Sequence, residues 1–556
     1  MNQKAEKNYL KIISLGGFGQ VTNNMFVYET EKDILIVDCG IGFPTEEMRG
    51  VDLLIPDVSY LLPKKQKIKG LIISHGHDDH IGALPYILPK LGKIPVFGSK
   101  WALALAREKL SEFGFGANFQ EISEGKKLFL GNFQIEFIEV THSIPETMHL
   151  VISTPIGIFY HAADFKLDLT PVMGKPTDQN LIVQVGKRGV FCLLSDCLRA
   201  EREGFTPSEA KLQEMFEREI EKTLGKFFVT TMSSNISRLK QAIEVSQRHK
   251  RKVVLVGRSV EENVAQALKL SYLKFPPNLF LSVKEARRFP ALGLTFLVAG
   301  SQGQPGSALE KIVAGEHEVK IERGDKVVFS TDYIPGNEAA IYALIDEIMR
   351  QGGEVSYADV TSDVHVSGHG SSSDLKKLIE MVKPKFVLPI GGNFRHMIAY
   401  QKLAQGLGFQ KDRIILPDNG QIVKLFSEGR VDLSQAIEVR TVMVDALGVG
   451  DVGNVVLRDR KILSQEGIVV AIILIDQLTF KLLSEPEIVT RGFVYVKESE
   501  KLIRETKTEI KKILAKWTGK KTEFRFVQRD LQDALEKFFF QKTGRRPIIL
   551  TQVIKV

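Results

Sequence analysis

The sequence contains few cysteines and no long apolar run. Its three cysteines, Cys39, Cys192 and Cys197, form neither a CxxC pair nor a disulfide framework, which favours a reducing compartment. The first seven residues lack the apolar core of a signal peptide. The longest apolar run, residues 468–475, is far shorter than the ~20 residues that span a bilayer. We therefore expect a cytoplasmic protein with no membrane partner.

Internal repeats and low-complexity segments are also lacking, so repeat architectures and disordered tails are not expected. The chain has 556 residues, of which 44% are hydrophobic and 26% charged. This is ordinary globular composition, and the length predicts two to four domains. The net charge of +8 is a weak indication of a polyanionic partner. Basic runs such as residues 248–252 are more often solvated faces than binding sites.

A short polar stretch is the most informative part of the chain. It reads SHGHDDH over residues 74–80, between apolar runs at 71–73 and 81–88. These runs predict a buried strand and a short helix. Three imidazoles and two carboxylates in six residues would be costly to bury in an apolar core. A solvated polar loop would explain a single histidine, but this spacing between a strand and a helix favours a metal site.

The spacing within this stretch indicates two ions. His75 and His77 alternate along extended chain and can share one ion. Asp79 and His80 lie beyond the bend and can reach a second one. Imidazole and carboxylate together suit zinc, manganese or iron.

Two later residues extend the predicted metal site. His142 and Asp164 each follow a predicted strand, and Asp164 can place one oxygen on each ion. The order of these residues and their positions at strand ends are those that a two-metal site needs. We interpret His149 and His161, for which no partner is evident, as structural.

The remaining pattern predicts three regions. Strands at 9–15, 24–29, 34–38, 94–97 and 133–137, with a helix at 100–113, favour an α/β sandwich. Buried-type strands at 227–231, 252–256, 294–298 and 327–330, separated by helical stretches, predict an inserted doubly wound domain. The C-terminal region is expected to contain strands at 453–457 and 468–475 and a long basic helix near 497–517.

Over almost its whole length the chain resembles the ribonuclease J family, in the β-CASP branch of the metallo-β-lactamase superfamily. The HGHDDH run alone identifies only the superfamily. Further matches are SD at 195–196, TTMSSN at 230–235 and GVGDVGN at 448–454, and the combination of HVSGH at 365–369 with the C-terminal unit is much more specific.

This resemblance implies the fold class and the domain order. The expected architecture is α/β: a metallo-β-lactamase αββα sandwich interrupted by a doubly wound β-CASP domain and followed by a small α+β C-terminal domain. The implied boundaries are 1–200 and 351–427 for the lactamase-like domain, 201–350 for the β-CASP domain, 428–445 for a linker and 446–556 for a C-terminal oligomerisation domain.

The resemblance also implies a metal-dependent ribonuclease, with 5′→3′ exonuclease and endonuclease activity in RNA maturation and decay. Two divalent ions, zinc in the first instance, are expected. The residues that match ligands of one ion are His75, His77, His142 and Asp164, and those that match the other are Asp79, His80 and Asp164. Asp38 matches a group that holds a ligand in place.

Roles in proton transfer and RNA binding are implied in the same way. Asp196 matches a proton donor and His369 an acceptor. The RNA-phosphate segment comprises His365, Val366, Ser367, Gly368 and His369, and its Gly-Ser-rich turn offers backbone N–H groups and imidazoles to phosphate. Ser234 and Asn235 match positions near a phosphate pocket. A structural calcium ion is implied at Gly50, Asp52 and Asp445, whose carboxylates can equally be surface groups.

The implied partners are an RNA with a 5′-monophosphate end and further copies of the chain. A homodimer or homotetramer would form through the C-terminal region, and partners in an RNA-decay complex are also implied.

One motif departs from the family pattern. Where the family usually has Pro-x-His-Gly-Glu, this chain has PIGGN at 389–393, so Gly391 takes the histidine position and Asn393 the glutamate position. That histidine would complete the shell of the second ion. We expect a weakly held second ion, manganese or magnesium being alternatives to zinc. His396 is a candidate substitute, although a surface position is the better interpretation.

Three function classes follow from this sequence. The favoured one is an active metal-dependent ribonuclease, because the other side chains of the site are all present. The Gly391 change motivates the alternative of a weakly active or inactive RNA-binding subunit of a nuclease complex. A small-molecule hydrolase is disfavoured, because the inserted domain and the basic charge suit a long anionic substrate.

Overall fold

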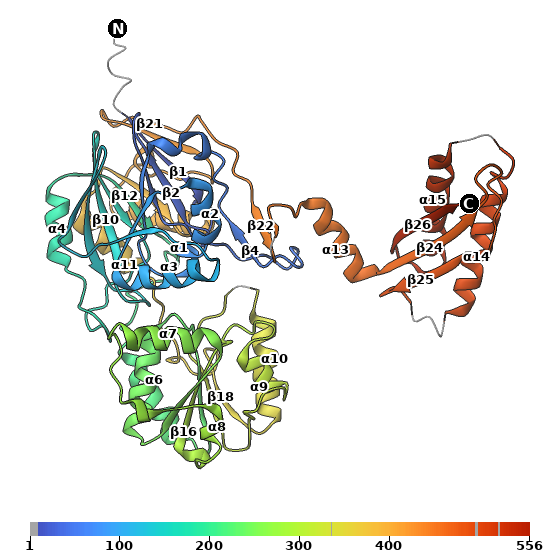
Figure 1. Ribbon diagram of the computed structural model, residues 1–556. Helices are drawn as coiled ribbons and strands as arrows, with labels where there is room; N and C mark the ends of the chain where they lie inside the picture. Colours follow the sequence, from blue (N-terminus) through green and yellow to red (C-terminus); the bar gives the residue numbers. More distant parts are fainter. Residues whose placement is uncertain (1–8, 335, 447, 495–498, 521–522) are drawn as a thin grey trace, which may run out of the picture. The chain divides into compact units, whose positions relative to one another are not determined.

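The computed structural model describes residues 9–334, 336–446, 448–494, 499–520 and 523–556. The chain forms two compact units (Figure 1). The first unit comprises residues 1–42 and 55–441, and the second comprises 43–54 and 442–556. The expectation that the first seven residues contain no signal peptide falls outside the described residues. Among the described residues, no helix combines the length and the apolar composition needed to cross a membrane.

Two facing sheets form the first part of the first unit. Alternating apolar residues such as Leu10, Phe26, Ile135 and Leu150 meet in one core between them. The eight-stranded sheet has the order β21 (Val431–Asp432), β20 (Ile422–Phe426), β1 (Tyr9–Gly16), β2 (Met25–Glu29), β3 (Ile34–Val37), β5 (Ile68–Ile72), β6 (Pro95–Gly98) and β7 (Asn118–Glu121). The six-stranded sheet has the order β19 (Phe386–Ile390), β12 (Val190–Asp196), β11 (Gly157–Ala162), β10 (Thr147–Thr154), β9 (Phe133–Val140) and β8 (Lys127–Leu130).

Helices cover the outer faces of this sandwich. The six-stranded sheet packs on α4 (Gln179–Lys187), α11 (Ser372–Val382) and α12 (Phe394–Gly406) through a second apolar cluster. On the eight-stranded side, α3 (Lys100–Glu112) contacts β6, β7 and α2 (Leu84–Leu91). The predicted αββα sandwich is therefore confirmed.

The inserted region has its own parallel sheet with helices on both faces, as predicted. Figure 1 shows α6 (Ile236–Arg248) on one side of this sheet and α10 (Glu338–Arg350) on the other. Clusters of buried apolar residues fill both helix–sheet layers, which include α5 (Lys211–Glu221), α7 (Arg258–Lys269), α8 (Val283–Ala286) and α9 (Ala308–Val313). The strand order is β15 (Phe280–Leu281), β14 (Lys252–Val256), β16 (Leu294–Val298), β13 (Phe227–Thr230), β17 (Lys326–Phe329) and β18 (Glu354–Ser356).

Within its described residues, the second unit contains two small sheets and three helices. The sheet β25 (Glu487–Arg491), β24 (Ile468–Ile475) and β26 (Ile548–Lys555) packs on α14 (Glu500–Ala515) and α15 (Phe524–Thr543). The other sheet has the order β23 (Gly448–Val449), β22 (Val442–Asp445) and β4 (Leu53–Ile55). The strand predicted at 468–475 is confirmed, and α14 matches the predicted basic helix, whose residues 497–498 lie outside the described residues.

One element prediction in this unit is wrong. Residues 453–457 were expected to form a strand, because Val455, Val456 and Leu457 are apolar and two of them are β-branched. They begin helix α13 (Asn454–Glu466) instead, with extended Gly453 as its N-cap. The next residues, Arg458 onward, continue the helix with charged side chains, and the short apolar run could not distinguish the two structures.

Candidate metal centre

The predicted metal ligands and Asp196 meet at one edge of the sandwich because each lies at or just after the carboxyl end of a strand. The 74–80 stretch follows β5, His142 follows β9, Asp164 follows β11, and Asp196 ends β12. Strands β9, β11 and β12 end at the same edge of the six-stranded sheet, since β9 runs antiparallel to β10 and β10 antiparallel to β11, while β11 runs parallel to β12. The segment after β5, in the other sheet, meets this edge, where Met148 N donates to the Ser74 carbonyl at 2.9 Å. The short helix α1 (Asp78–Ile81) begins within the motif and carries Asp79 and His80.

Three imidazoles and one carboxylate form the first cluster. His75 Nε2 lies 3.1 Å from His77 Nδ1, which lies 3.2 Å from His142 Nε2. Asp164 Oδ2 lies 3.6 Å from His75 Nε2 and 3.8 Å from His142 Nε2. In a tetrahedral zinc site with bonds of about 2.0–2.1 Å, neighbouring ligand atoms are about 3.4 Å apart. The donor set and its spacing therefore fit one divalent ion.

Burial keeps these imidazoles neutral, as metal ligation requires. It lowers the pKa of His75 and His142 well below the usual range and that of His77 to about 4, with neighbouring histidines adding to the effect. His142 Nδ1 donates to the Gly368 carbonyl at 2.7 Å, which leaves the lone pair of Nε2 free to face the cluster. Three lone pairs that face one another without a proton favour a shared cation.

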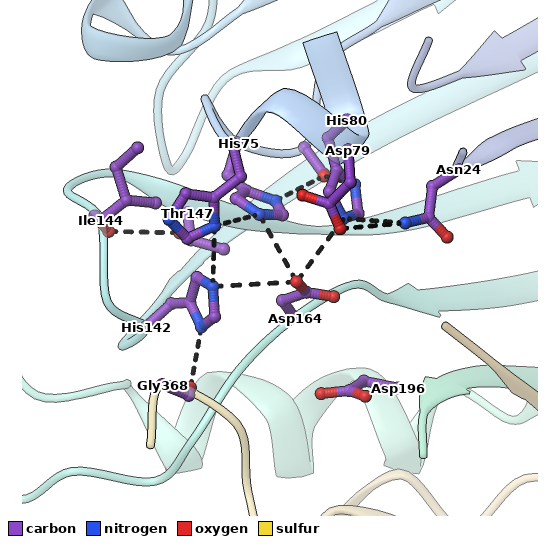
Figure 2. A network of polar contacts seen from close by, with 12 residues as sticks. Asn24, His75, Asp79, His80, His142, Ile144, Thr147, Asp164, Asp196 and Gly368 are labelled. Carbon is purple, nitrogen blue, oxygen red and sulfur yellow. Dashed lines mark hydrogen bonds and ion pairs between the residues drawn. The ribbon is translucent and has the colours of Figure 1, made fainter. Parts of the chain in front are cut away.

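A second cluster comprises Asp79, His80 and Asp164. His80 Nε2 lies 3.5 Å from both Asp79 Oδ2 and Asp164 Oδ2. Figure 2 shows the Asp164 carboxylate between His142 and His75 on one side and His80 on the other. Although burial opposes a charge on His80, the carboxylates of Asp79, Asp164 and Asp38 raise its pKa well above the usual range. The same negative field would attract a second cation.

The two oxygens of Asp164 have different surroundings. One oxygen was expected on each ion, but the contacts of Asp164 with His75, His80 and His142 all involve the same atom, Oδ2. Oδ1 instead lies 3.9 Å from where a Cβ on Gly391 would stand. Oδ2 is thus the Asp164 oxygen that faces both clusters, Oδ1 faces the space next to Gly391, and the use of one oxygen for each ion stays a prediction.

Asp38 lies where the sequence predicted a supporting group. Its oxygens accept from Ser74 N at 2.7 Å, from Ser74 Oγ at 2.8 Å and from His80 Nδ1 at 2.8 Å. Its φ of 63° is rare for a residue with a side chain, and such a conformation persists where surrounding bonds hold it. Asp38 thereby orients His80 and the first turn of the motif.

Asp196 and His369 form a pair beside the metal cluster. His369 Nδ1 donates to Asp196 Oδ2 at 2.7 Å, and His369 Nε2 lies 3.7 Å from Asp164 Oδ2. Burial raises the pKa of Asp196. Burial also opposes the charge of His369, but Asp196 and Asp164 raise its pKa to about 9. The two proposed proton-transfer groups thus share one short hydrogen bond.

The 365–369 segment is attached directly to this centre. Its Gly368 carbonyl accepts from the ligand candidate His142, and Ser367 Oγ accepts from His369 N at 3.1 Å. A Cβ on Gly368 would lie 2.8 Å from Ser143, so the close approach requires glycine. Val366 is buried and His365 half-buried at the inserted region.

The other predicted residues lie elsewhere. His149 and His161 are buried and contact Tyr160 and Tyr28 through their Nδ1 atoms, at 3.1 and 2.9 Å. The surface position expected for His396 is wrong, because its side chain is buried at the start of α12. Its ring nitrogens lie against Asn393 N and Arg395 Nε, and it belongs to none of the ligand clusters found among the described residues.

The three residues predicted to hold a structural cation lie in the second unit. Asp52 Oδ2 accepts from Ala446 N at 2.7 Å, and Asp445 forms an ion pair with Arg460. The Arg460 guanidinium lies 2.7 Å from where a Cβ on Gly50 would stand. A positive group of the chain itself therefore lies among these three residues.

Sequence reasoning missed several polar residues around the centre. Asn24 Nδ2 lies 3.2 Å from His80 Nε2 and 3.4 Å from Asp79 Oδ2 (Figure 2). Buried Asp374 accepts from Leu167 N and Thr206 N. Asn24 carries no local motif. Asp374 completes a Ser-x-x-Asp capping box at the start of α11, but this local signal does not predict its contacts with Leu167 and Thr206.

Four family models match the chain. By their descriptions and the residues matched, they are "Metallo-beta-lactamase superfamily" (18–187), "Ribonuclease J, beta-CASP domain" (224–348), "Zn-dependent metallo-hydrolase RNA specificity domain" (357–417) and "Ribonuclease J C-terminal domain" (455–556). Together they follow the order of the regions described above: a metallo-β-lactamase domain, a β-CASP domain and a C-terminal domain.

Full-length relatives give the same result. The chain is 36% identical over 560 residues to Ribonuclease J2 of Bacillus subtilis, with 100% of both chains covered. It is 37% identical over 565 residues to Ribonuclease J of Thermus thermophilus, with 100% of this chain and 96% of the relative covered. A solved structure of a protein of unknown function from Enterococcus faecalis V583 aligns with a TM-score of 0.51 and 14% identity, covering 75% of this chain and all of its own, a likeness of fold alone.

Proposed function

Since this chain belongs to the ribonuclease J family and is a metal-dependent enzyme that hydrolyses RNA, we propose that it degrades RNA both from the 5′ end, in the 5′→3′ direction, and by internal cleavage. Its role would be in RNA maturation and decay. The observation that carries this proposal is the 2.7 Å contact between His142 and Gly368, which joins the metal cluster to the segment proposed to hold the RNA phosphate.

The proposed metal ligands divide into two sets that share one atom. His75, His77, His142 and Asp164 would hold the first ion, and Asp79, His80 and Asp164 the second. The nitrogen-rich first set suits zinc. The second set has one imidazole where the first has three, and Gly391 stands where the family usually has a further histidine, so manganese or magnesium with additional water suits it as well.

Each polar group beside the ions has a task in phosphodiester cleavage. Two divalent ions, when bound, neutralise the charge of the phosphate and lower the pKa of an attacking water. Asp196 would give a proton to the leaving oxygen and His369 would accept one, and their 2.7 Å hydrogen bond supports a joint role. His369, with a pKa raised to about 9 by its carboxylate neighbours, would act as an acceptor once the charge of bound cations lowers that pKa. Residues 365–369 would bind the RNA phosphate, with a preference for a 5′-monophosphate end.

Assembly and environment are proposed from the rest of the chain. The domains would follow the boundaries given above, with the C-terminal region forming a homodimer or homotetramer that also meets partners in RNA decay. Gly50, Asp52 and Asp445 remain a candidate for a structural calcium ion, which would compete with the nearby Arg460. Three free, buried cysteines suit the reducing cytoplasm.

A second candidate function rests on Gly391. If the second ion is too weakly held for turnover, the chain would act as an RNA-binding subunit of a nuclease complex with little activity of its own. Its positive net charge and intact 365–369 segment would serve binding in either case.

The two candidates are separated by a cleavage assay with purified protein. The chain is stripped with a chelator, reloaded with manganese, magnesium or zinc, and mixed with 5′-monophosphorylated or 5′-triphosphorylated RNA. We expect mononucleotides released from the 5′ end and internal fragments, with faster release from the monophosphate. We expect the D164A variant to lose both ions and all cleavage, because both ligand sets need Asp164, whereas D412A, an exposed carboxylate on the first unit, should behave as wild type.

Bound but uncleaved RNA with every metal would favour the subunit. Turnover of a small ester or lactam in place of RNA would overturn both candidates.

A further inference from the structure

Arg238, on α6, is a buried side chain outside the metal centre that makes five hydrogen bonds. Its Nε and Nη2 donate to the two oxygens of Glu209 at 2.9 and 3.0 Å. Nη2 also donates to the Val366 carbonyl at 2.7 Å, and Nη1 donates to the Ser330 carbonyl and to His365 Nδ1 at 2.8 and 2.9 Å. A guanidinium has five N–H donors, so every one of them has a partner.

These contacts determine which nitrogen of His365 carries a proton. Arginine only donates and does not lose its proton in proteins, so His365 Nδ1 must be the acceptor. The proton of a neutral His365 is then on Nε2, which lies 3.2 Å from Asp332 Oδ2. Burial and the charge of Arg238 lower the pKa of His365, which keeps the ring neutral. The ring therefore carries an N–H group rather than a charge, and an RNA phosphate would compete for this group with the exposed carboxylate of Asp332.

Glu209 connects this arrangement to the metal side of the molecule. Its Oε2 lies 3.7 Å from Lys166 Nζ, and the same ammonium lies 3.6 Å from Asp168 Oδ2. Lys166 follows the shared ligand candidate Asp164 by two residues. The two cations and two carboxylates are all buried, and their charges balance. A buried charge without a partner is costly, so these four groups hold one another in place.

We propose that Arg238 is a positioning residue for RNA binding: it holds His365 as the Nε2–H tautomer and fixes the Val366 carbonyl, so that residues 365–369 present their N–H groups to an RNA phosphate. The inference rests on the proposed role of that segment. The ion pair with Glu209 alone would not require an arginine at this position, because well-packed apolar side chains can replace a buried ion pair without loss of stability. The directed bonds to the segment are what an apolar replacement would lose.

The test compares three substitutions on α6. R238M removes all five donors, and R238K keeps a charge opposite Glu209 but loses the planar fork. K240M is the matched control, because Lys240 pairs only with Glu244 on the same helix among the contacts found. With manganese and 5′-monophosphorylated RNA, we expect R238M to raise KM by at least about tenfold, with kcat at saturating RNA within about threefold of wild type. The KM of R238K should lie between those of wild type and R238M, and K240M should match wild type in both KM and kcat.

The double variant E209L/R238M covers the case in which R238M fails to fold. It removes both charges, so neither is left uncompensated, and it should show the same rise in KM. A fall in kcat and in the melting temperature with unchanged KM would make Arg238 purely structural and overturn the proposal.

A second readout reports on the ring itself. Nitrogen-15 spectra of histidine-labelled protein should show His365, assigned by the loss of its signals in H365Q, protonated on Nε2 only at neutral pH, and R238M should abolish this fixed tautomer. A proton on Nδ1 in the wild-type protein would refute the inference. If wild-type protein cleaves RNA and R238M equals it in KM, only this inference fails; if wild-type protein leaves every RNA uncleaved, the proposed function fails first.

Discussion

Asp164 shows how much depends on single atoms in this centre. Its Oδ2 contacts three histidines from the two clusters, while its Oδ1 faces Gly391. A ligand that bridges two ions couples their occupancies, because losing either ion changes the charge that the carboxylate must balance. The chemistry at this edge of the sandwich is therefore most sensitive at Asp164 and at the space next to it.

Introducing a histidine at Gly391 should increase the affinity of the protein for the second ion. A Cβ there would meet no atom nearer than 3.9 Å, at Asp164 Oδ1 and Asp196 Oδ1, and histidine tolerates the φ of 64° better than most residues. Since even a supporting partner of a metal is worth about 10–100-fold in affinity, we expect G391H to gain at least that factor for the second ion. The measurement is a metal titration of chelator-stripped protein.

A matched control for this titration is G114H. Gly114 has a φ of 65° and no atom within 4 Å of its added Cβ. It shares the backbone conformation and open surroundings of Gly391 and belongs to no ligand cluster found among the described residues. Equal metal stoichiometry and affinity in wild type, G391H and G114H would mean that another group already completes the coordination of the second ion.

At the scale of elements, helix α11 holds the centre together through its third residue. Asp374 is fully buried and accepts from Leu167 N at 3.1 Å, from Thr206 N at 2.8 Å and from Ser371 N at 3.0 Å. These amides belong to the segments that follow Asp164, Asp196 and His369. One carboxylate at the start of a helix thus ties together three segments that carry site residues.

Removing this carboxylate should destabilise the first unit. D374A leaves three buried N–H groups without their acceptor, and each such group costs about 1–3 kcal/mol. We therefore expect the free energy of unfolding to fall by about 3 kcal/mol or more, as measured by chemical denaturation. The control E380A changes an exposed carboxylate on the same helix and should stay within about 0.5 kcal/mol of wild type. Equal stability of D374A and E380A would contradict this account.

For the molecule as a whole, the second unit leaves one apolar sheet face uncovered among the described residues. Along β24, residues Val469, Ala471, Ile473 and Ile475 are buried toward the helices, while the alternating Val470, Ile472 and Leu474 are half-exposed. On the adjacent β26, Leu550 is 51% exposed. Such a face is typical of an interface, and it supports self-association through the C-terminal region.

A charge on this face should separate the copies. We expect L550E to shift the molar mass measured by light scattering from that of an oligomer to that of a monomer, because an ionised carboxylate would be buried in the apolar interface. L478E is the control, since Leu478 is 86% exposed on the turn after β24 and its neighbours are polar. A monomeric wild-type protein, or an L550E variant of unchanged mass, would refute the proposed interface.

The sequence by itself determined the local features. Apolar runs located most strands, and polar residues directly after those runs identified the ligand candidates, because a strand end carries its next side chains to one edge of the sheet. The same reasoning failed at residues 453–457, where three apolar residues suit a helix as well as a strand.

Only the tertiary structure decided what depends on distant parts of the chain. The contacts of Asp164 Oδ2 with both histidine clusters, the three hydrogen bonds of Asp374 and the five of Arg238 join segments up to 207 residues apart. Such contacts leave no periodic pattern, because a buried polar side chain is selected by partners that the fold brings to it. Local sequence therefore predicts which residues form the candidate site, and long-range packing decides how they are held.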